Sequence, residues 1–101
     1  MVEYRLSAEA ESELDEIWLY IARASGSVEI ANRAVDNITD RFWLLAQHPY
    51  IGRRRDDDLS SGLRSLSVQE YVVVYRVESS GIVLILHVLH GSRDISTFFT
   101  D

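Results

Sequence analysis

Residues 7–49, SAEAESELDEIWLYIARASGSVEIANRAVDNITDRFWLLAQHP, contain two helical apolar stripes separated by one short turn. The apolar residues of each stripe recur at the spacing of one helix face. They are Leu14, Ile17, Trp18 and Ile21 in the first stripe, and Ala31, Ala34, Val35, Ile38, Phe42 and Leu45 in the second. Two helices with facing stripes and a short connection are predicted to pack as an antiparallel hairpin.

The sequence also marks the ends of both helices. Ser7 is the predicted N-cap of the first helix, and the acidic residues that follow it suit the positive end of a helix dipole. The run Ser25-Gly26-Ser27 is predicted to end that helix. The second helix is predicted from about Val28 to His48, because the residue before Pro49 is pushed out of helical geometry.

Strand signals lie on both sides of this hairpin. Residues 3–6 form one candidate strand before it. After it come a predicted loop over residues 50–62 and candidate strands over residues 63–68, 70–77 and 82–89. The last of these strands is almost wholly apolar, so we expect it in the interior of the sheet.

The predicted fold class is α+β, in the order β-α-α-β-β-β. A short N-terminal strand precedes the two-helix antiparallel hairpin, which is expected to cover one face of a small antiparallel sheet because neither layer can hide its apolar side alone. One domain over residues 1–101 is expected from the length. The closing residues 90–101 are predicted as a short helix or a frayed tail.

Composition excludes several classes of protein. The chain has no cysteine and no lysine, and its formal net charge is −6. A disulfide framework, a thiolate metal site and a lysine base are therefore excluded, and we expect no metal or other cofactor. The acidity argues against direct nucleic-acid binding. With no run of about 18 apolar residues and no secretory signal, the chain is expected to be cytoplasmic, away from membranes.

Short motifs follow one another along the chain in a specific order. They are Tyr4-Arg5-Leu6-Ser7 with Ala10 and Leu14, Asp15-Glu16-Ile17-Trp18 with Tyr20-Ile21-Ala22, then Phe42, Leu45, Ala46, Pro49, Gly52-Arg53 and Gly62-Leu63-Arg64-Ser65. The most specific are Tyr71-Val72-Val73-Val74-Tyr75-Arg76 and Val88-Leu89-His90-Gly91-Ser92-Arg93-Asp94. Together they resemble the ParE toxins of the RelE/ParE superfamily over nearly the whole chain.

The resemblance implies the toxin of a type II toxin–antitoxin system with a RelE/ParE-like fold. It implies a ParD-like antitoxin, encoded beside the toxin, as the partner and DNA gyrase as the target. The RelE-like relatives in the superfamily are instead ribosome-dependent mRNA endonucleases. Two alternatives therefore remain open, such an endonuclease and a non-toxic module that only binds its partner.

The residues favour the gyrase-binding, non-enzymatic interpretation, and no catalytic residue is assigned. RNA cleavage requires a general base, cationic groups for the developing charge and an acid. RelE-type enzymes are expected to draw these from lysines, arginines and a C-terminal tyrosine. This chain has no lysine, and its C-terminal aromatic residues, Phe98 and Phe99, have no hydroxyl group.

Two groups of residues are the candidate binding sites. Aromatic and apolar residues of the hairpin are the predicted antitoxin contacts, unless they only pack the hairpin, and these are Trp18, Tyr20, Ile21 and Trp43. Basic residues of the second half are predicted to contact the target or to form a vestigial active-site rim, and these are Arg64, Arg76, His90 and Arg93.

Some of the charged residues also have structural interpretations. His87 is predicted as a hydrogen-bonded structural histidine, and Arg76 as a member of a buried ion pair. His90 and Arg93 are alternatively predicted to cap a strand end with an ion pair to Asp94 or another acid. The run Arg53–Asp58 is predicted as a solvated loop whose charges largely neutralise one another.

Overall fold

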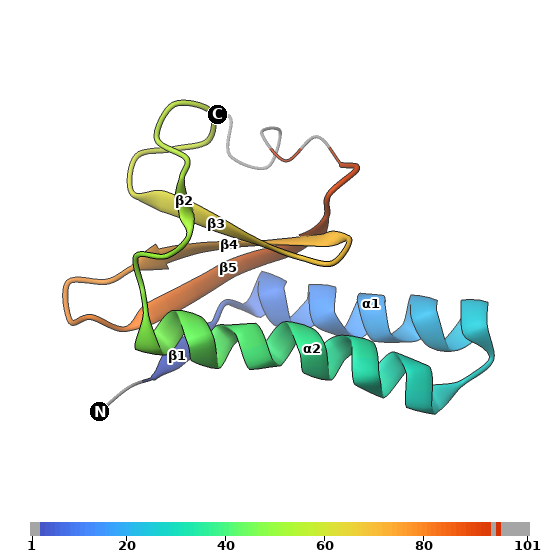
Figure 1. The fold of residues 1–101 in the computed structure, drawn as a ribbon. Helices are drawn as coiled ribbons and strands as arrows, with labels where there is room; N and C mark the ends of the chain where they lie inside the picture. The colour runs from blue at the N-terminus through green and yellow to red at the C-terminus, as the bar shows by residue number, and fades with distance from the viewer. Residues whose placement is uncertain (1–2, 94, 96–101) are drawn as a thin grey trace.

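The computed structural model describes residues 3–93 and 95, which form one helical layer and one sheet layer (Figure 1). In chain order the elements are β1 Tyr4–Leu6, α1 Ala8–Ser25, α2 Val28–Gln47, β2 Arg53–Arg54, β3 Leu63–Val68, β4 Tyr71–Val77 and β5 Val83–His90. The two helices lie side by side beneath the sheet in this view and run in opposite directions (Figure 1). The predicted α+β fold, a helical hairpin packed on a small sheet, is confirmed.

The sheet differs from the predicted one in two respects. Its strand order is β1-β5-β4-β3-β2, and β1 pairs with β5 in parallel, so the sheet is mixed. A parallel pair needs a long connection, which the hairpin and the intervening strands supply. The predicted loop also contains a strand, because Arg53 and Arg54 pair with Ser65 and Arg64. Two arginines show no apolar alternation, so no sequence pattern marked β2. As predicted, β5 lies in the interior of the sheet.

The helix ends agree with the predicted capping signals to within one residue. The Ser7 hydroxyl oxygen accepts a hydrogen bond from the backbone N–H of Ala10 at 3.0 Å. Gly26 ends α1 in the left-handed conformation, with φ at 70°, and Ser27 caps the start of α2. The second helix ends at Gln47, one residue before the predicted end. Neither described helix has the apolar length that would let it cross a membrane.

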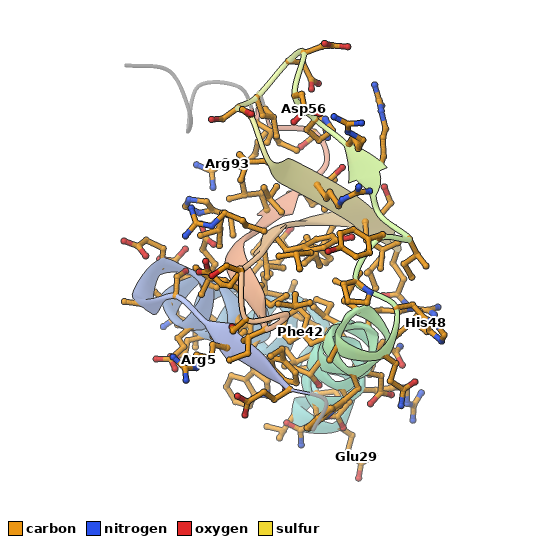
Figure 2. The ribbon with its side chains drawn as sticks, turned by 90° about the vertical axis from the view of Figure 1, so that its left-hand side faces the viewer. Arg5, Glu29, Phe42, His48, Asp56 and Arg93 are labelled. Carbon is orange, nitrogen blue, oxygen red and sulfur yellow. The ribbon has the colours of Figure 1, made fainter. Side chains whose placement is uncertain are left out.

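Apolar side chains pack on both faces of the sheet. The larger cluster lies between sheet and helices and includes the fully buried Ile38, Phe42 and Ile85. Figure 2 shows Phe42 pointing from α2 towards the sheet. Each such side chain contributes about 1.5–3 kcal/mol through burial. A smaller cluster covers the other face and includes Leu89 and Ile95. Beyond Ile95, the predicted short helix or frayed tail, with Phe98 and Phe99, lies outside the described residues.

The phenol of Tyr75 fixes the connection between α2 and β2. Its hydroxyl accepts a hydrogen bond from the N–H of Gly52 at 2.9 Å and donates one to the carbonyl of Pro49 at 2.7 Å. A Cβ atom at position 52 would collide with this phenol, so the position requires glycine. Burial raises the pKa of Tyr75 above its ordinary value, so ionisation of this hydroxyl is disfavoured. The Arg64 guanidinium donates to the carbonyls of Tyr50 and Gly52 and closes the same segment.

Replacing Tyr75 by phenylalanine is expected to lower the free energy of unfolding by about 1–3 kcal/mol, because it leaves a buried N–H without its acceptor. Urea unfolding measures the change as a lower midpoint at an unchanged slope. The matched control is Tyr50→Phe, which removes the same hydroxyl from a ring that is 67% exposed. Equal midpoints for the two variants would contradict the role assigned to Tyr75.

Candidate functional site

A cleft of about 290 Å³ lies between α1 and the end of the sheet where β4 begins and β5 ends. Its α1 wall comprises Glu13, Glu16, Ile17 and Tyr20, and its sheet wall comprises Glu70, Tyr71, Val88, Leu89, His90 and Arg93. Both walls combine apolar surface with charged groups. The cleft is therefore suited to bind a partner that is apolar and charged at once.

Residues predicted for two different roles meet in this cleft. Tyr20, a predicted antitoxin contact, is 70% exposed on its α1 wall. His90 and Arg93, predicted to belong to a target-contact rim, lie on the sheet wall. Figure 2 shows Arg93 on the side of the molecule that carries α1. The structure thus joins part of each predicted site into one surface.

The other predicted antitoxin contacts lie elsewhere on the hairpin. The indole N–H of Trp18 donates to the side-chain oxygen of Asn32 in α2 at 2.7 Å, so Trp18 ties the two helices together. Trp43 is 52% exposed and packs edge-on against Tyr4, with ring centroids 4.9 Å apart. Ile21 is partly buried on α1. The alternative of hairpin packing therefore describes Trp18, while Trp43 belongs to a separate surface beside β1.

Arg64 and Arg76 lie away from the cleft, towards the other end of β4. Tyr71, at the cleft, is paired with His90, and Arg76 follows five residues later on β4, a separation of about 16 Å along a strand. Arg76 pairs with Glu78 at 3.2 Å, but its side chain is 46% exposed. The prediction of a buried ion pair at Arg76 is therefore wrong, because this residue lies near the end of β4 with its side chain open to solvent.

The N-cap residue of α1, Ser7, binds the edge of β5 at the point where the parallel strand β1 ends. The pairing of β1 with β5 stops at Leu6 and Ile85. Ser7 continues the contact, because its N–H donates to the carbonyl of Ile85 at 2.9 Å and its hydroxyl donates to the carbonyl of Leu86 at 2.7 Å. Leu86 is the extra residue at an irregularity in the β4–β5 register. The start of α1 is therefore fixed against an irregular part of β5.

Nearly two turns further along α1, Glu13 binds the next part of this edge. One carboxylate oxygen accepts the N–H of Val88 at 2.9 Å, and the other lies 2.9 Å from Nδ1 of His87. The Glu13 and His87 side chains are only 15% and 17% exposed. The prediction that His87 is a hydrogen-bonded structural histidine is confirmed.

His90 closes the end of β5. Its Nδ1 accepts the N–H of Ser92 at 3.1 Å and lies 2.7 Å from the hydroxyl of the same residue. Its Nε2 lies 3.7 Å from the carboxylate of Glu70, and its ring packs edge-on against Tyr71. The predicted strand-end contact to an acid is thus made with Glu70, whereas Asp94 lies outside the described residues.

Two ion pairs form within residues 53–58, as the predicted neutralisation implies, although the segment is not wholly a solvated loop because it includes β2 and the Arg55 side chain is only 14% exposed. Arg54 binds Asp56 and Arg55 binds Asp58, each with a shortest contact of 2.6 Å. The N–H of Gly62 and the Arg54 guanidinium hold the pKa of Asp56 below its usual value. These groups are engaged with one another and lie outside the cleft.

Sequence reasoning missed most of the cleft lining. Glu16 shares one face of α1 with Tyr20, a spacing that was readable from the sequence. No local pattern indicated that Glu70 and Tyr71 would lie opposite them. Burial raises the pKa of Tyr71, and the neighbouring Glu70 and Tyr20 raise it further. Among residues 3–93 and 95, no group of three or more histidine, aspartate or glutamate side chains is arranged to hold a metal ion.

Comparison with solved structures shows the class of fold. The chain is similar to a structure titled "Chromosomal ParDE TA system from P. aeruginosa", with a TM-score of 0.76 and 24% identity, covering 89% of this chain and 96% of that one. It is also similar to a chain of the toxin–antitoxin complex RelBE2 from Mycobacterium tuberculosis, with a TM-score of 0.64 and 19% identity, covering 89% of this chain and 99% of that one. The chain therefore shares its fold with chains of the ParDE and RelBE systems.

Sequence comparison gives the family. The model described as "ParE toxin of type II toxin-antitoxin system, parDE" matches residues 4–95. Toxin ParE1 of Caulobacter vibrioides is 37% identical over 94 residues, covering 93% of this chain and 94% of the relative. Toxin ParE1 of Mycobacterium tuberculosis H37Rv is 33% identical over 94 residues, covering 91% and 92%. The chain therefore belongs to the ParE family of type II toxins.

Replacing Glu13 by alanine is expected to lower the free energy of unfolding by about 1–3 kcal/mol, because the partly buried N–H of Val88 loses its acceptor. Urea unfolding gives the free energy, and amide hydrogen exchange should accelerate specifically at Val88. The control is Asp15→Ala, which removes an exposed acid from the same helix. Unchanged exchange at Val88 would refute the anchoring role of Glu13.

Proposed function

We propose that this ParE toxin inhibits DNA gyrase and that a ParD-like antitoxin neutralises it. The observation that carries the proposal is the family match over residues 4–95. Identity of 37% with Toxin ParE1 of Caulobacter vibrioides, across nearly the full length of both chains, supports a shared mode of action. The toxin then acts by binding another protein, without catalysis of its own.

The placement of the basic residues supports this choice over an mRNA endonuclease. A ribonuclease site needs its base, its acid and its cationic groups within reach of one phosphate. Of the four basic residues predicted for the rim, His90 and Arg93 share the cleft, whereas Arg64 and Arg76 lie outside it. The Arg64 guanidinium is held by two backbone carbonyls. The four basic residues are therefore spread over the sheet and do not converge on one point.

The α1 cleft is the proposed docking site of the antitoxin. A segment that folds on binding gains affinity by covering apolar surface beside fixed charged groups. The cleft offers both, with Tyr20 exposed at its edge and Ile17 partly buried inside it. Trp43, on its separate surface, remains the alternative contact for the antitoxin or for gyrase.

Expression of the toxin without its antitoxin is expected to arrest growth with an SOS response and filamentation. Purified toxin should inhibit supercoiling by gyrase and leave cleaved DNA, because a trapped gyrase–DNA complex is a DNA lesion. Mapping of mRNA ends provides the competing readout. We expect the mRNA to stay intact. Cuts within ribosomal A-site codons, without DNA damage, would instead show that the toxin is an mRNA endonuclease and contradict gyrase inhibition.

The product of the adjacent gene is expected to raise the thermal midpoint of the toxin, since a ligand that binds only the folded state stabilises it. When the free partner is at 100 times Kd, its binding raises the free energy of unfolding of the toxin by about 2.7 kcal/mol. Differential scanning fluorimetry of the toxin with increasing partner measures it. An unrelated protein of similar charge serves as the control, and an unchanged midpoint with the adjacent gene product would count against the pairing.

A further inference from the structure

The charges of the α1 cleft are unbalanced. Glu13, Glu16 and Glu70 line it with three carboxylates, whereas Arg93 provides the one guanidinium among its described lining residues. Glu13 is already bound to β5, and Glu70 lies near His90. Negative potential in a partly enclosed cleft attracts a cationic group and disfavours an anionic one.

Glu16 is the carboxylate of the cleft that is available to bind a partner group. Its side chain makes no hydrogen bond or ion pair with any of the described residues, and its residue is exposed. Tyr20 follows one turn later on the same helix face and is 70% exposed. A carboxylate beside an open aromatic ring matches a guanidinium or ammonium group, which binds the acid by a charge-assisted hydrogen bond and the ring by a cation–π contact.

The cleft continues along α1 towards the hairpin turn. This continuation is an open surface of α1 alone, made by Glu16, Leu19, Tyr20, Arg23 and Ala24, and it shares Glu16 and Tyr20 with the cleft. From Glu13 to Ala24 the helix rises by about 16 Å, which is the length of about three turns of a partner helix. Leu19, 42% exposed, adds apolar surface along this path. Glu16 and Tyr20 thus stand where the two-walled cleft passes into the open face of α1, and cleft and face together, here called the groove, are long enough for an amphipathic helix.

We propose that this groove binds an amphipathic segment of the antitoxin through one arginine or lysine of that segment, held between the Glu16 carboxylate and the Tyr20 ring. This inference rests on the proposed pairing with an antitoxin. The segment carries apolar residues on the flanking turns, which cover Ile17 and Leu19. A segment with an acid at the central position is rejected by the carboxylates of the cleft, so the same contact contributes to the choice of partner.

The test uses the whole toxin and the product of the adjacent gene, with affinity measured by isothermal titration calorimetry. Glu16→Gln keeps the shape of the side chain and removes its charge, and it is expected to weaken binding about five- to tenfold. Tyr20→Ala should weaken binding to a similar degree, whereas Tyr20→Phe keeps the ring and the affinity. Glu29→Gln is the matched control, because Glu29 is exposed in the first turn of α2 and lines neither the cleft nor the adjoining face of α1.

A double-mutant cycle identifies the partner residue. Each arginine and lysine of the antitoxin is replaced by methionine in turn, and each variant is titrated into the unmodified toxin and into the Glu16→Gln variant. One replacement is expected to weaken binding to the unmodified toxin about five- to tenfold and to have little further effect on Glu16→Gln. All toxin variants should keep the unfolding midpoint of the parent, since Glu16 and Tyr20 are exposed.

The outcomes separate the two proposals. Binding that is insensitive to Glu16→Gln, or a cycle in which no basic residue is coupled to Glu16, overturns this inference and leaves the antitoxin pairing standing. A Glu16→Gln variant that loses gyrase inhibition while keeping its antitoxin affinity assigns the groove to gyrase and also overturns the inference. Absence of binding between the unmodified proteins overturns the pairing, and this inference with it.

Discussion

The position of α1 depends on the open edge of β5. Because β1 is only three residues long, β5 loses its parallel neighbour after Ile85. Unpaired backbone groups at a partly buried edge are costly unless another group binds them. Ser7, the N-cap of α1, and Glu13, in its second turn, provide that binding. These contacts fix the position of α1 along β5 and its rotation about its own axis. Its next two turns, with Glu16 and Tyr20, are thereby placed opposite the end of the sheet.

Much of the fold could be predicted from the sequence, because its signals are local. The stripes of the hairpin, the capping residues Ser7 and Ser27, the left-handed turn at Gly26 and the residue before Pro49 each act within a few positions. The strands after the hairpin are recognisable because apolar and β-branched residues follow one another between turn residues. The parallel direction of β1 and the presence of β2 depend on partners far away in the sequence, and no periodicity encodes them.

The candidate site was predicted less completely for the same physical reason. Aromatic residues on a helix look alike whether they face a partner or a neighbouring helix, so Trp18 and Tyr20 could not be told apart before the contact with Asn32 was known. In the sequence, Glu13 is one of several acidic residues near a helix N-terminus and nothing distinguishes it. In the structure it accepts a hydrogen bond from the N–H of Val88, 75 residues later in the chain. The cleft arises from two elements that meet only in the folded chain.

The short strand β2 has a consequence for the toxin when it is alone. Sheet edges expose unpaired N–H and C=O groups that can recruit strands of other molecules. Here the outermost strand has two residues, and both are exposed arginines. Charge and brevity make this edge a poor template for intermolecular β-pairing. The protein on its own would thus resist aggregation through this short strand.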